Sequence, residues 1–438
     1  MNGNIKSVAI LGGGPAACTL AVLLARKKIR AAIFHLPKRA PLIVGESLVP
    51  AVIPILRLLG VEDEVRGYGL YKPGATINLS PTVNFSFPFA NIRGPLPTYA
   101  YNVPRDKFDD TLLAAARNAG VKIIEAAADV EKIPGTDKVK LSDASLAAAD
   151  GFFSDGAPVS DPASLNSTSR VGDRRSNQPD LIVDATGRLR LLPKLLGIPA
   201  REGGRKDTAL FAHVDATKLD FEGHVHTTRL DHGWSWRIPL QGKISVGMVI
   251  GSQHLPKFGA TKEERFDNLL KQDSVLMKVA KDAKRLTPVM EYTNYQLVSE
   301  RMFGENWALV GDTAGFIDPV FSSGLFLGME GAMLLADAIR KSSPRAFKKY
   351  EEECSHHLKC WQEIAEYFYD GRLFNSVTVG ERMEMKYPWV RLMSPWYRNH
   401  FGKIFTGAAS NSDFSLGMLR WVANYSAKQE NPQAMMIR

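Results

Sequence analysis

Three consecutive glycines near the start of the sequence are placed to bind phosphates. The order Gly12-x-Gly14-x-x-Ala17 follows an apolar run and precedes residues with helical spacing. Gly12 permits a tight turn, Gly14 lets the backbone approach a pyrophosphate, and Ala17 allows close packing of helix on strand. The N–H groups of the helix N-terminus then face the phosphates. We therefore expect a dinucleotide site that contains Gly12, Gly14, Pro15, Ala16 and Ala17.

The second strand of this unit, residues 31–34, ends where such sites usually carry an acidic residue that binds the ribose. This sequence has His35 at that place. A histidine can make one hydrogen bond to a ribose hydroxyl but not the bidentate contact of a carboxylate. We assign His35 to the cofactor site, and the way in which the ribose is bound stays open.

A second glycine-rich turn, residues 311–328, joins an apolar strand to a helical pattern. Asp312 at its start offers a carboxylate to a polyol, and we also assign Ile317 to the cofactor site. Near the end of the turn, backbone N–H groups at Ser323 and Gly324 face an anion or carbonyl that lies at the start of the helix. A purely structural turn is the alternative, since many α/β turns carry Gly and Asp.

Two further groups of residues are open to a chemical or a structural interpretation. Lys72 and Glu46 carry titratable groups, but isolated residues of these types usually lie on a solvated surface. The alternation in Trp-x-Trp-x-Ile-Pro places two indoles on one face of a strand, where they could equally be sheet core. The motif consists of Trp234, Trp236, Ile238 and Pro239.

These features, taken in order, resemble the two-component flavin-dependent halogenases. The resemblance rests on the dinucleotide turn, Gly-Glu-Ser-x-x-Pro (45–50), Tyr-Lys-Pro-Gly-Ala (71–75) and the Trp-x-Trp-x-Ile-Pro motif, and covers about residues 5–375. It implies an enzyme that uses reduced FAD, oxygen and chloride or bromide to make hypohalous acid. It also implies a separate NAD(P)H-dependent flavin reductase, in agreement with the single dinucleotide fingerprint.

The resemblance also assigns roles to individual residues. Lys72 would deliver the halogen from hypohalous acid to an electron-rich ring, and Glu46 would assist proton transfer. The tryptophan motif would keep the flavin from acting directly on the substrate, and Ser323 with Gly324 would hold the halide. The remaining expected cofactor contacts are Glu46, Ser47, Arg105 and Asp312.

One departure from the pattern of the tryptophan-specific halogenases limits the class of substrate. Halogenases that act on free tryptophan carry a glutamate just before the hydroxyl pair, whereas this sequence has Phe321. The resemblance is therefore to the branch that acts on phenols and pyrroles, either free or tethered to a carrier protein. A flavin-dependent aromatic hydroxylase and a flavoprotein that has lost halogenation remain as alternatives.

The strands and helices that are expected to carry these residues, together with the resemblance, indicate an α/β chain with the glutathione-reductase type of FAD-binding fold. We expect a discontinuous Rossmann-like FAD-binding domain, an antiparallel β-sheet domain that shields flavin and substrate, and a helical C-terminal lid over the substrate. Their expected boundaries are 1–75, 101–200 and 300–341 for the first, 76–100 and 201–299 for the second, and 342–438 for the third.

Composition limits the other possibilities. The net charge of +9 comes from scattered residues, without the aromatic-interleaved basic stripe of nucleic-acid binders, although it would suit an acidic carrier protein. No apolar run is long enough to span a membrane. The three cysteines form no disulfide framework, which favours the cytoplasm. Cys354 lies on an apolar helical stripe, so we expect no metal site from Cys354, His356, His357 and Cys360.

Overall fold

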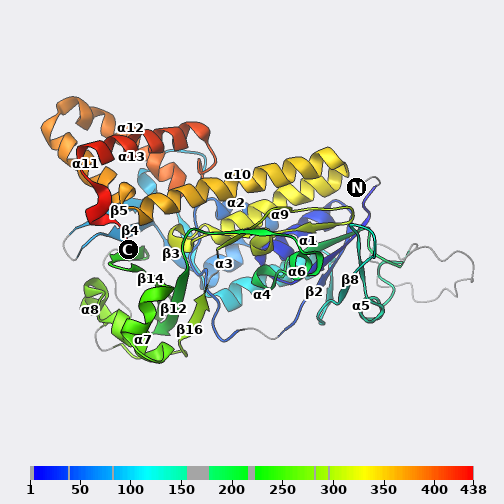
Figure 1. Cartoon of the computed structure of the whole chain (residues 1–438). Helices are drawn as coiled ribbons and strands as arrows, with labels where there is room; N and C mark the ends of the chain where they lie inside the picture. The colour runs from blue at the N-terminus through cyan, green and yellow to red at the C-terminus, as the bar shows by residue number, and fades with distance from the viewer. Residues whose placement is uncertain are drawn as a thin grey trace, which may run out of the picture.

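The computed structural model describes residues 4–37, 40–80, 83–154, 177–215, 222–280, 283–293 and 296–437. Within these ranges a parallel sheet is covered by helices, a larger sheet lies beside it, and a group of helices forms the C-terminal region (Figure 1). This mixed architecture agrees with the predicted α/β class.

The parallel sheet is assembled from segments far apart in the sequence. Its strand order is β18-β10-β1-β2-β7, and every neighbouring pair is parallel. Near-continuous apolar runs form its central strands, as expected where helices cover both faces. Because β10 returns to lie beside β1, and β18 beside β10, the predicted discontinuous nucleotide-binding fold is confirmed. The strands are β1 (Ser7–Leu11), β2 (Arg30–Phe34), β7 (Lys122–Ile124), β10 (Leu181–Asp184) and β18 (Trp307–Leu309).

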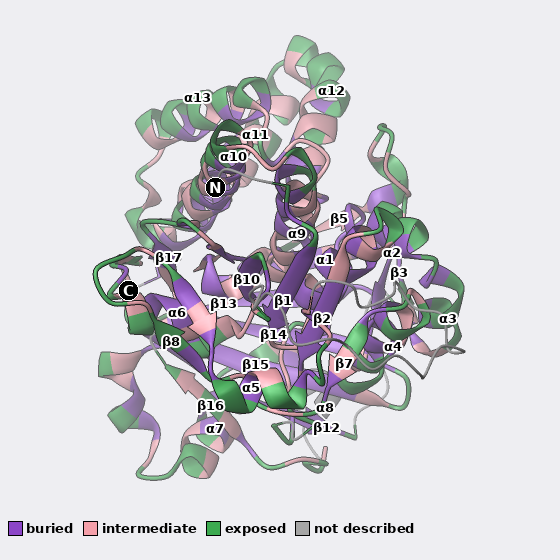
Figure 2. Ribbon diagram, turned by 90° about the vertical axis from the view of Figure 1, so that its right-hand side faces the viewer, coloured by how far each residue is buried: buried purple, intermediate pink, exposed green. Residues whose placement is uncertain are grey.

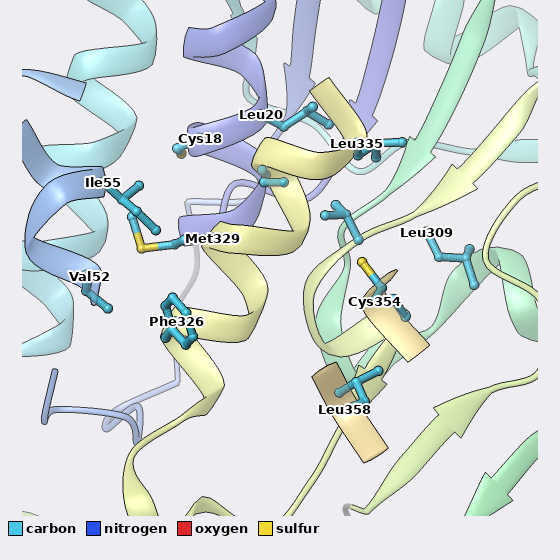
Figure 3. Packing of buried hydrophobic residues seen from close by; sticks show 14 of the residues in the cluster. Cys18, Leu20, Val52, Ile55, Leu309, Phe326, Met329, Leu335, Cys354 and Leu358 are labelled. Atoms are coloured by element: carbon cyan, nitrogen blue, oxygen red, sulfur yellow. The ribbon is translucent and has the colours of Figure 1, made fainter. Parts of the chain in front are cut away.

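Helix α1 (Pro15–Arg26) follows β1 and packs against α9 (Gly324–Lys341) and α4 (Arg105–Asn118). A shared apolar core fixes the start of α1 relative to α9. Figure 3 shows Met329 of α9 pointing toward Ile55 of α2 (Val52–Leu59), with Cys18 of α1 nearby. The same core takes in Cys354 (Figure 3).

The larger sheet has the strand order β16-β12-β15-β14-β13-β4-β5. Alternate residues of its central strands belong to two different cores. Trp234, Trp236 and Ile238 face the main core, whereas Val246 and Met248 join a smaller core with helices α7 (Lys262–Leu270) and α8 (Ser274–Ala280). The strands are β4 (Gly74–Asn78), β5 (Asn84–Pro88), β12 (Asp207–Val214), β13 (Val225–Leu230), β14 (Gly233–Leu240), β15 (Lys243–Gly251) and β16 (Met290–Thr293).

One pair in this sheet corrects the expectation of a wholly antiparallel domain. Strand β4 pairs with β13 in parallel, with Ala75 opposite Val225, while the other pairs are antiparallel. Because β4 comes from a distant part of the chain, no hairpin obliges it to run antiparallel to its neighbour. The division into three domains stays a prediction.

The C-terminal region is helical, as expected. Helix α10 (Pro344–Tyr369) lays its apolar stripe along α9, and helices α11 (Arg372–Lys386), α12 (Pro388–Phe405) and α13 (Asp413–Gln429) gather at its far end (Figure 1). Among the described residues, no helix combines the length and apolarity required to cross a bilayer.

Shorter elements complete the described chain. The remaining helices are α3 (Glu62–Tyr68), α5 (Asp143–Ala148), α6 (Leu191–Leu196), α7 (Lys262–Leu270) and α8 (Ser274–Ala280). The remaining strands are β3 (Leu70–Lys72), β6 (Ala100–Asn102), β8 (Val130–Lys132), β9 (Val139–Leu141), β11 (Ala200–Glu202), β17 (Leu297–Ser299) and β19 (Gly315–Phe316).

Candidate active site

A cavity of about 640 Å³ lies where the parallel sheet meets the larger sheet. This volume is in the range of sites for cofactors and drug-sized ligands. Its wall is made by the β1–α1 turn, residues 43–47, the turn after β10, the inner face of β14 and the turn before α9. Nine of the residues expected at the cofactor line it, namely Gly12, Gly14, Pro15, Ala16, Ala17, Glu46, Ser47, Arg105 and Asp312.

The glycine turn has the geometry that its sequence predicts. Gly12 has φ +101°, and a Cβ there would lie 2.5 Å from the carbonyl oxygen of Ala185, so only glycine fits. Gly14 precedes α1, with Pro15 as the first helical residue, and nothing lies within 4 Å of where its Cβ would be. This open space in front of a helix N-terminus fits a pyrophosphate.

The second glycine turn lies directly against the first. A Cβ on Gly311, which has φ +67°, would lie 3.0 Å from Cβ of Ala16, and one on Gly328 would lie 3.6 Å from Cα of Gly311. Small residues therefore allow the two turns to meet, and this brings Asp312 to the same cavity as Gly14.

Asp312 is a half-buried carboxylate on the wall of this cavity. Burial raises its pKa to about 6, while the positive charges of Arg105 and Arg188 oppose the rise. Arg105 is itself held in place, since it donates to Asp109 at 3.0 Å and to the carbonyl of Val44. A carboxylate deprived of water favours a ligand that offers hydroxyl groups, so Asp312 fits the ribityl chain of a flavin.

Lys72 lies on the other side of the cavity wall. It donates to Oγ of Ser47 and to the carbonyl oxygen of Leu48, each at 2.8 Å, and its amine lies 5.5 Å from the ring centre of Phe89. Burial lowers the pKa of this amine to about 7. A considerable fraction of Lys72 is thus a free amine at neutral pH, which exposed lysines are not.

A second, much smaller cavity of about 40 Å³ is lined by Lys72 and Phe321. Aromatic rings of Phe87 and Phe405 also line it, and the ring centres of Phe321 and Phe405 are 4.7 Å apart. The two cavities share four wall residues, namely Val225, Thr227, Val320 and Ser322. Lys72 is therefore separated from the large cavity by only a thin wall.

The tryptophan motif faces the large cavity. Trp234, Trp236 and Ile238 line it, whereas Pro239 does not. The indole of Trp234 donates from Nε1 to the hydroxyl of Tyr369 at 2.8 Å, and a Cβ on Gly247 would lie only 2.1 Å from the ring of Trp236. The sheet and helix α10 therefore fix both indoles in position.

Two buried contacts at this site were missed from the sequence. Tyr369 donates to Oδ2 of Asp318 at 2.7 Å, and burial raises the pKa of Asp318 to about 7. Glu46 Oε1 lies 2.8 Å from Nε2 of His213, and both side chains are buried. Asp318 stands before a proline and caps the short helical turn after it, which is a usable sequence signal. Tyr369 and His213 occur in ordinary helix and strand patterns.

Some expected residues lie beside the large cavity rather than on its wall. The ring of His35 covers Gly13, where a Cβ would be 2.5 Å from Nδ1. Ile317 lines a separate cavity of about 130 Å³ behind Phe316. At the start of α9, Gly324 and Ser322 line the large cavity, whereas Ser323 is buried just behind them.

Comparisons with known proteins match these features. A family model described as tryptophan halogenase matches residues 84–373, and one described as FAD binding domain matches residues 6–141. The chain is 28% identical to a tryptophan 2-halogenase of Chondromyces crocatus, over 83% of this chain and 67% of that protein. It is 27% identical to a 1H-pyrrole-2-carbonyl peptidyl-carrier-protein chlorinase of Pseudomonas fluorescens, over 84% of each.

Solved structures agree on the fold. A flavoprotein/dehydrogenase from Cytophaga hutchinsonii superposes with a TM-score of 0.77 at 22% identity, covering 98% of this chain and 100% of the other. The flavin-dependent brominase Bmp2 superposes with a TM-score of 0.73 at 19% identity, with the same coverage.

Proposed function

This chain belongs to the tryptophan halogenase family of FAD-binding enzymes, and from that premise we propose that it halogenates a phenol or a pyrrole through Lys72. The observation that carries the proposal is the position of Lys72. Its buried amine lies in a small aromatic cavity that shares a wall with the cofactor cavity. With the flavin in the large cavity and the substrate in the small one, a halogen carrier is required at such a place.

The cofactor cavity fits FAD in shape and donor set. The turn of Gly12 to Ala17 would bind the pyrophosphate, and Asp312 would accept hydrogen bonds from ribityl hydroxyls. When bound and reduced, FAD supplies the electrons for FADH₂ + O₂ + X⁻ + H⁺ → FAD + HOX + H₂O, in which X⁻ is chloride or bromide. The N–H groups around Gly324, at the start of α9, attract the halide because they carry partial positive charge.

Lys72 accepts the halogen from hypohalous acid and passes it to the aromatic ring. In R–NH₂ + HOX → R–NHX + H₂O the amine nitrogen attacks the halogen and water leaves. The ring then takes the halogen and returns a proton to the amine, in R–NHX + ArH → R–NH₂ + ArX. Hydrogen bonding of hypohalous acid to the ammonium form is the other route, and in both routes burial of Lys72 keeps the oxidant from water.

The tryptophan motif supports the wall between the two cavities. Trp234 and Trp236 line the cofactor cavity on the side of the larger sheet, and Thr227, which lies opposite Trp236 on the neighbouring strand, belongs to the wall that the two cavities share. Glu46, held by His213, lines the cofactor cavity and is placed to handle the proton that the first step consumes.

The substrate cavity selects aromatic rings. Phe321 stands where the tryptophan-specific branch carries a glutamate, and it forms an aromatic wall with Phe405. At about 40 Å³ the cavity is smaller than a substituted ring, so α12, which contributes Phe405, must shift to admit one. A pyrrole held by a carrier protein is one candidate, since the Pseudomonas relative is named for that substrate. A separate NAD(P)H-dependent reductase supplies reduced FAD.

The test is a reaction of the purified protein with FAD, a flavin reductase, NADH, bromide and a panel of phenols and carrier-bound pyrroles. We expect products with the paired isotope masses of bromine. Lys72→Ala should abolish halogenation while the flavin is still reoxidised, and Lys359→Ala, an exposed lysine on α10, should change neither. Products that carry added oxygen instead of bromine would identify a hydroxylase, and a Lys72→Ala variant with wild-type halogenation would refute the role of Lys72.

A further inference from the structure

The outer end of the helical region carries an apolar stripe that no element of the described chain covers. Trp389, Leu392, Met393 and Trp396 follow the spacing i, i+3, i+4 and i+7 on α12, which places them on one face. They are exposed, with 64% of Trp389 and 81% of Leu392 accessible to solvent. Large apolar side chains gathered in this way mark an interaction surface rather than a chance exposure.

The stripe is part of a wider surface. Neighbouring exposed apolar residues come from the end of α11, from Tyr387 and from α13, and Figure 2 shows much of α12 and α13 in the exposed class. We call the stripe and these neighbours the outer aromatic surface. Its members are Met385, Tyr387, Trp389, Leu392, Met393, Trp396, Phe414, Trp421 and Tyr425.

The charge around this surface is mainly positive. Residues 381–430, which contain the whole surface, have seven Lys and Arg residues against four Asp and Glu residues, and Glu384 pairs with Arg398 at 2.9 Å. The chain as a whole is nearly balanced by comparison, with 55 basic and 46 acidic residues. The local excess of cations therefore predicts an anionic partner.

The shape of the surface favours a lipid bilayer over a protein partner. It lies on helices at one extremity of the molecule (Figure 1), and its residues line none of the cavities of about 640, 130 and 40 Å³ described above. A projecting helix with Trp and Leu on one face and Arg on the other is the form that lies in a membrane interface. Tryptophan and tyrosine are also the residues enriched at headgroup level.

We propose that α12 and its neighbours bind the surface of an anionic membrane, with Trp389, Leu392 and Trp396 inserted at the headgroup boundary. The helix lies along the bilayer and does not cross it. The opposite end of the same helix contributes Gly402 and Phe405 to the small cavity at Lys72. Membrane binding therefore acts on the element that covers this cavity.

Vesicle sedimentation tests the proposal with the full chain. We expect the protein to sediment with vesicles made of equal parts of phosphatidylcholine and phosphatidylglycerol, and much less with phosphatidylcholine alone or at high salt. The triple variant Trp389→Ser/Leu392→Ser/Trp396→Ser should bind at least ~10-fold more weakly, because it removes the apolar contacts. Leu58→Ser/Leu189→Ser, two exposed leucines elsewhere, is the matched control and should bind normally.

A second pair of variants tests the charge. Lys386→Glu/Arg391→Glu should lose roughly 10-fold or more in binding to the anionic vesicles, whereas Lys122→Glu/Lys359→Glu should not. A wild-type protein that stays in the supernatant would overturn the proposal. Dimerisation abolished by the triple variant, without vesicle binding, would assign the surface to a second copy. Binding of an acidic carrier protein through this surface, again without vesicle binding, would assign it to that partner.

Discussion

The indole Nε1 of Trp234 donates a hydrogen bond to the hydroxyl of Tyr369 across 2.8 Å. The tyrosine in turn donates to Asp318 at 2.7 Å. Three elements that are remote in sequence are thereby joined: strand β14, the last turn of α10 and the turn that leads to α9. The orientation of the tryptophan wall therefore depends on a residue outside its motif.

Removal of this hydroxyl should loosen the wall. Tyr369→Phe leaves the buried indole N–H of Trp234 without its acceptor, a loss that costs about 1–3 kcal/mol in the free energy of unfolding. We expect less halogenated product for each NADH consumed, measured together with urea denaturation. The control is Tyr367→Phe, whose hydroxyl contacts Glu363 on a partly exposed face. An unchanged ratio of product to NADH would show that Tyr369 has no part in positioning Trp234.

The pKa of Lys72 predicts a pH dependence of stability. This lysine has a pKa of about 7 in the folded protein, against 10.5 for an ordinary lysine. Between these values the unfolded state binds more protons, so the free energy of unfolding rises with pH by up to about 1.4 kcal/mol per pH unit. Lys72→Met lacks this slope, whereas Lys359→Met should keep it. Urea denaturation at several pH values above about 7 measures the difference.

The same pKa predicts the pH dependence of halogenation. If the free amine of Lys72 accepts the halogen, the rate rises as pH increases through about 7, because the amine loses its proton there. Flavin reoxidation, measured in parallel without substrate, should not follow this curve. A halogenation rate that falls over the same range would favour the ammonium form as the hydrogen-bond donor.

Short sequence patterns were enough to predict the positions of residues whose role depends on the local backbone or on a single strand. The glycine spacing predicted the tight turn at Gly12 and the open space at Gly14. The alternation of Trp234 and Trp236 predicted that both indoles lie on the same face of their strand. The pairing of Glu46 with His213 across 167 positions was not predictable, because a buried histidine in a strand carries no sign of its partner. The same holds for the parallel pairing of β4 with β13.

The sequence also did not predict which side chains of a turn line the cavity. The halide turn was expected to offer the backbone N–H groups of Ser323 and Gly324, and the sequence did not show how the serine side chains would lie: Ser322 adopts φ +59° and lies on the cavity wall, while Ser323 is buried. A left-handed residue changes the direction of the next side chain, and the pattern Ser-Ser-Gly does not reveal which serine takes it. The roles of both serines stay predictions.

Replacement of Asp312 by asparagine should stabilise the ligand-free protein but weaken its affinity for FAD. Burial raises its pKa from 3.8 to about 6, so the ligand-free folded state binds more protons between these values and becomes less stable as pH rises through them. Asp312→Asn removes this cost and should raise the Tm of the ligand-free protein at neutral pH. It should also weaken FAD binding ~10-fold or more, because charged hydrogen bonds to the ribityl chain are lost.

Thermal unfolding and flavin fluorescence titration measure the two effects of Asp312→Asn. Asp337→Asn on the exposed face of α9 is the control and should leave FAD affinity unchanged. A variant that loses stability and retains FAD would contradict the position assigned to Asp312.

The outer face of the tryptophan strand offers a last test. Ser235 and Arg237 alternate with the two indoles and point away from the cavity, where both contact the buried carboxylate of Asp273. Arg237 also donates to Thr228 at 2.7 Å, and Asp273 accepts from the N–H of Leu276 at 2.9 Å, so the strand is fixed to the start of α8. Asp273→Ala leaves the charge of Arg237 buried without its carboxylate, which costs about 3–5 kcal/mol.

Two further variants separate the effect of an unpaired buried charge on stability from the effect of lost packing. Asp273→Leu/Arg237→Met removes both charges and should be less destabilised than Asp273→Ala, because a buried ion pair can often be replaced by apolar residues of similar volume. Asp267→Ala, which removes the partly exposed partner of Arg285, should cost less than about 1 kcal/mol. Urea denaturation ranks the three proteins. If Asp273→Ala were no worse than Asp267→Ala, the tryptophan strand would not depend on this ion pair, and its position would have to come from the main core alone.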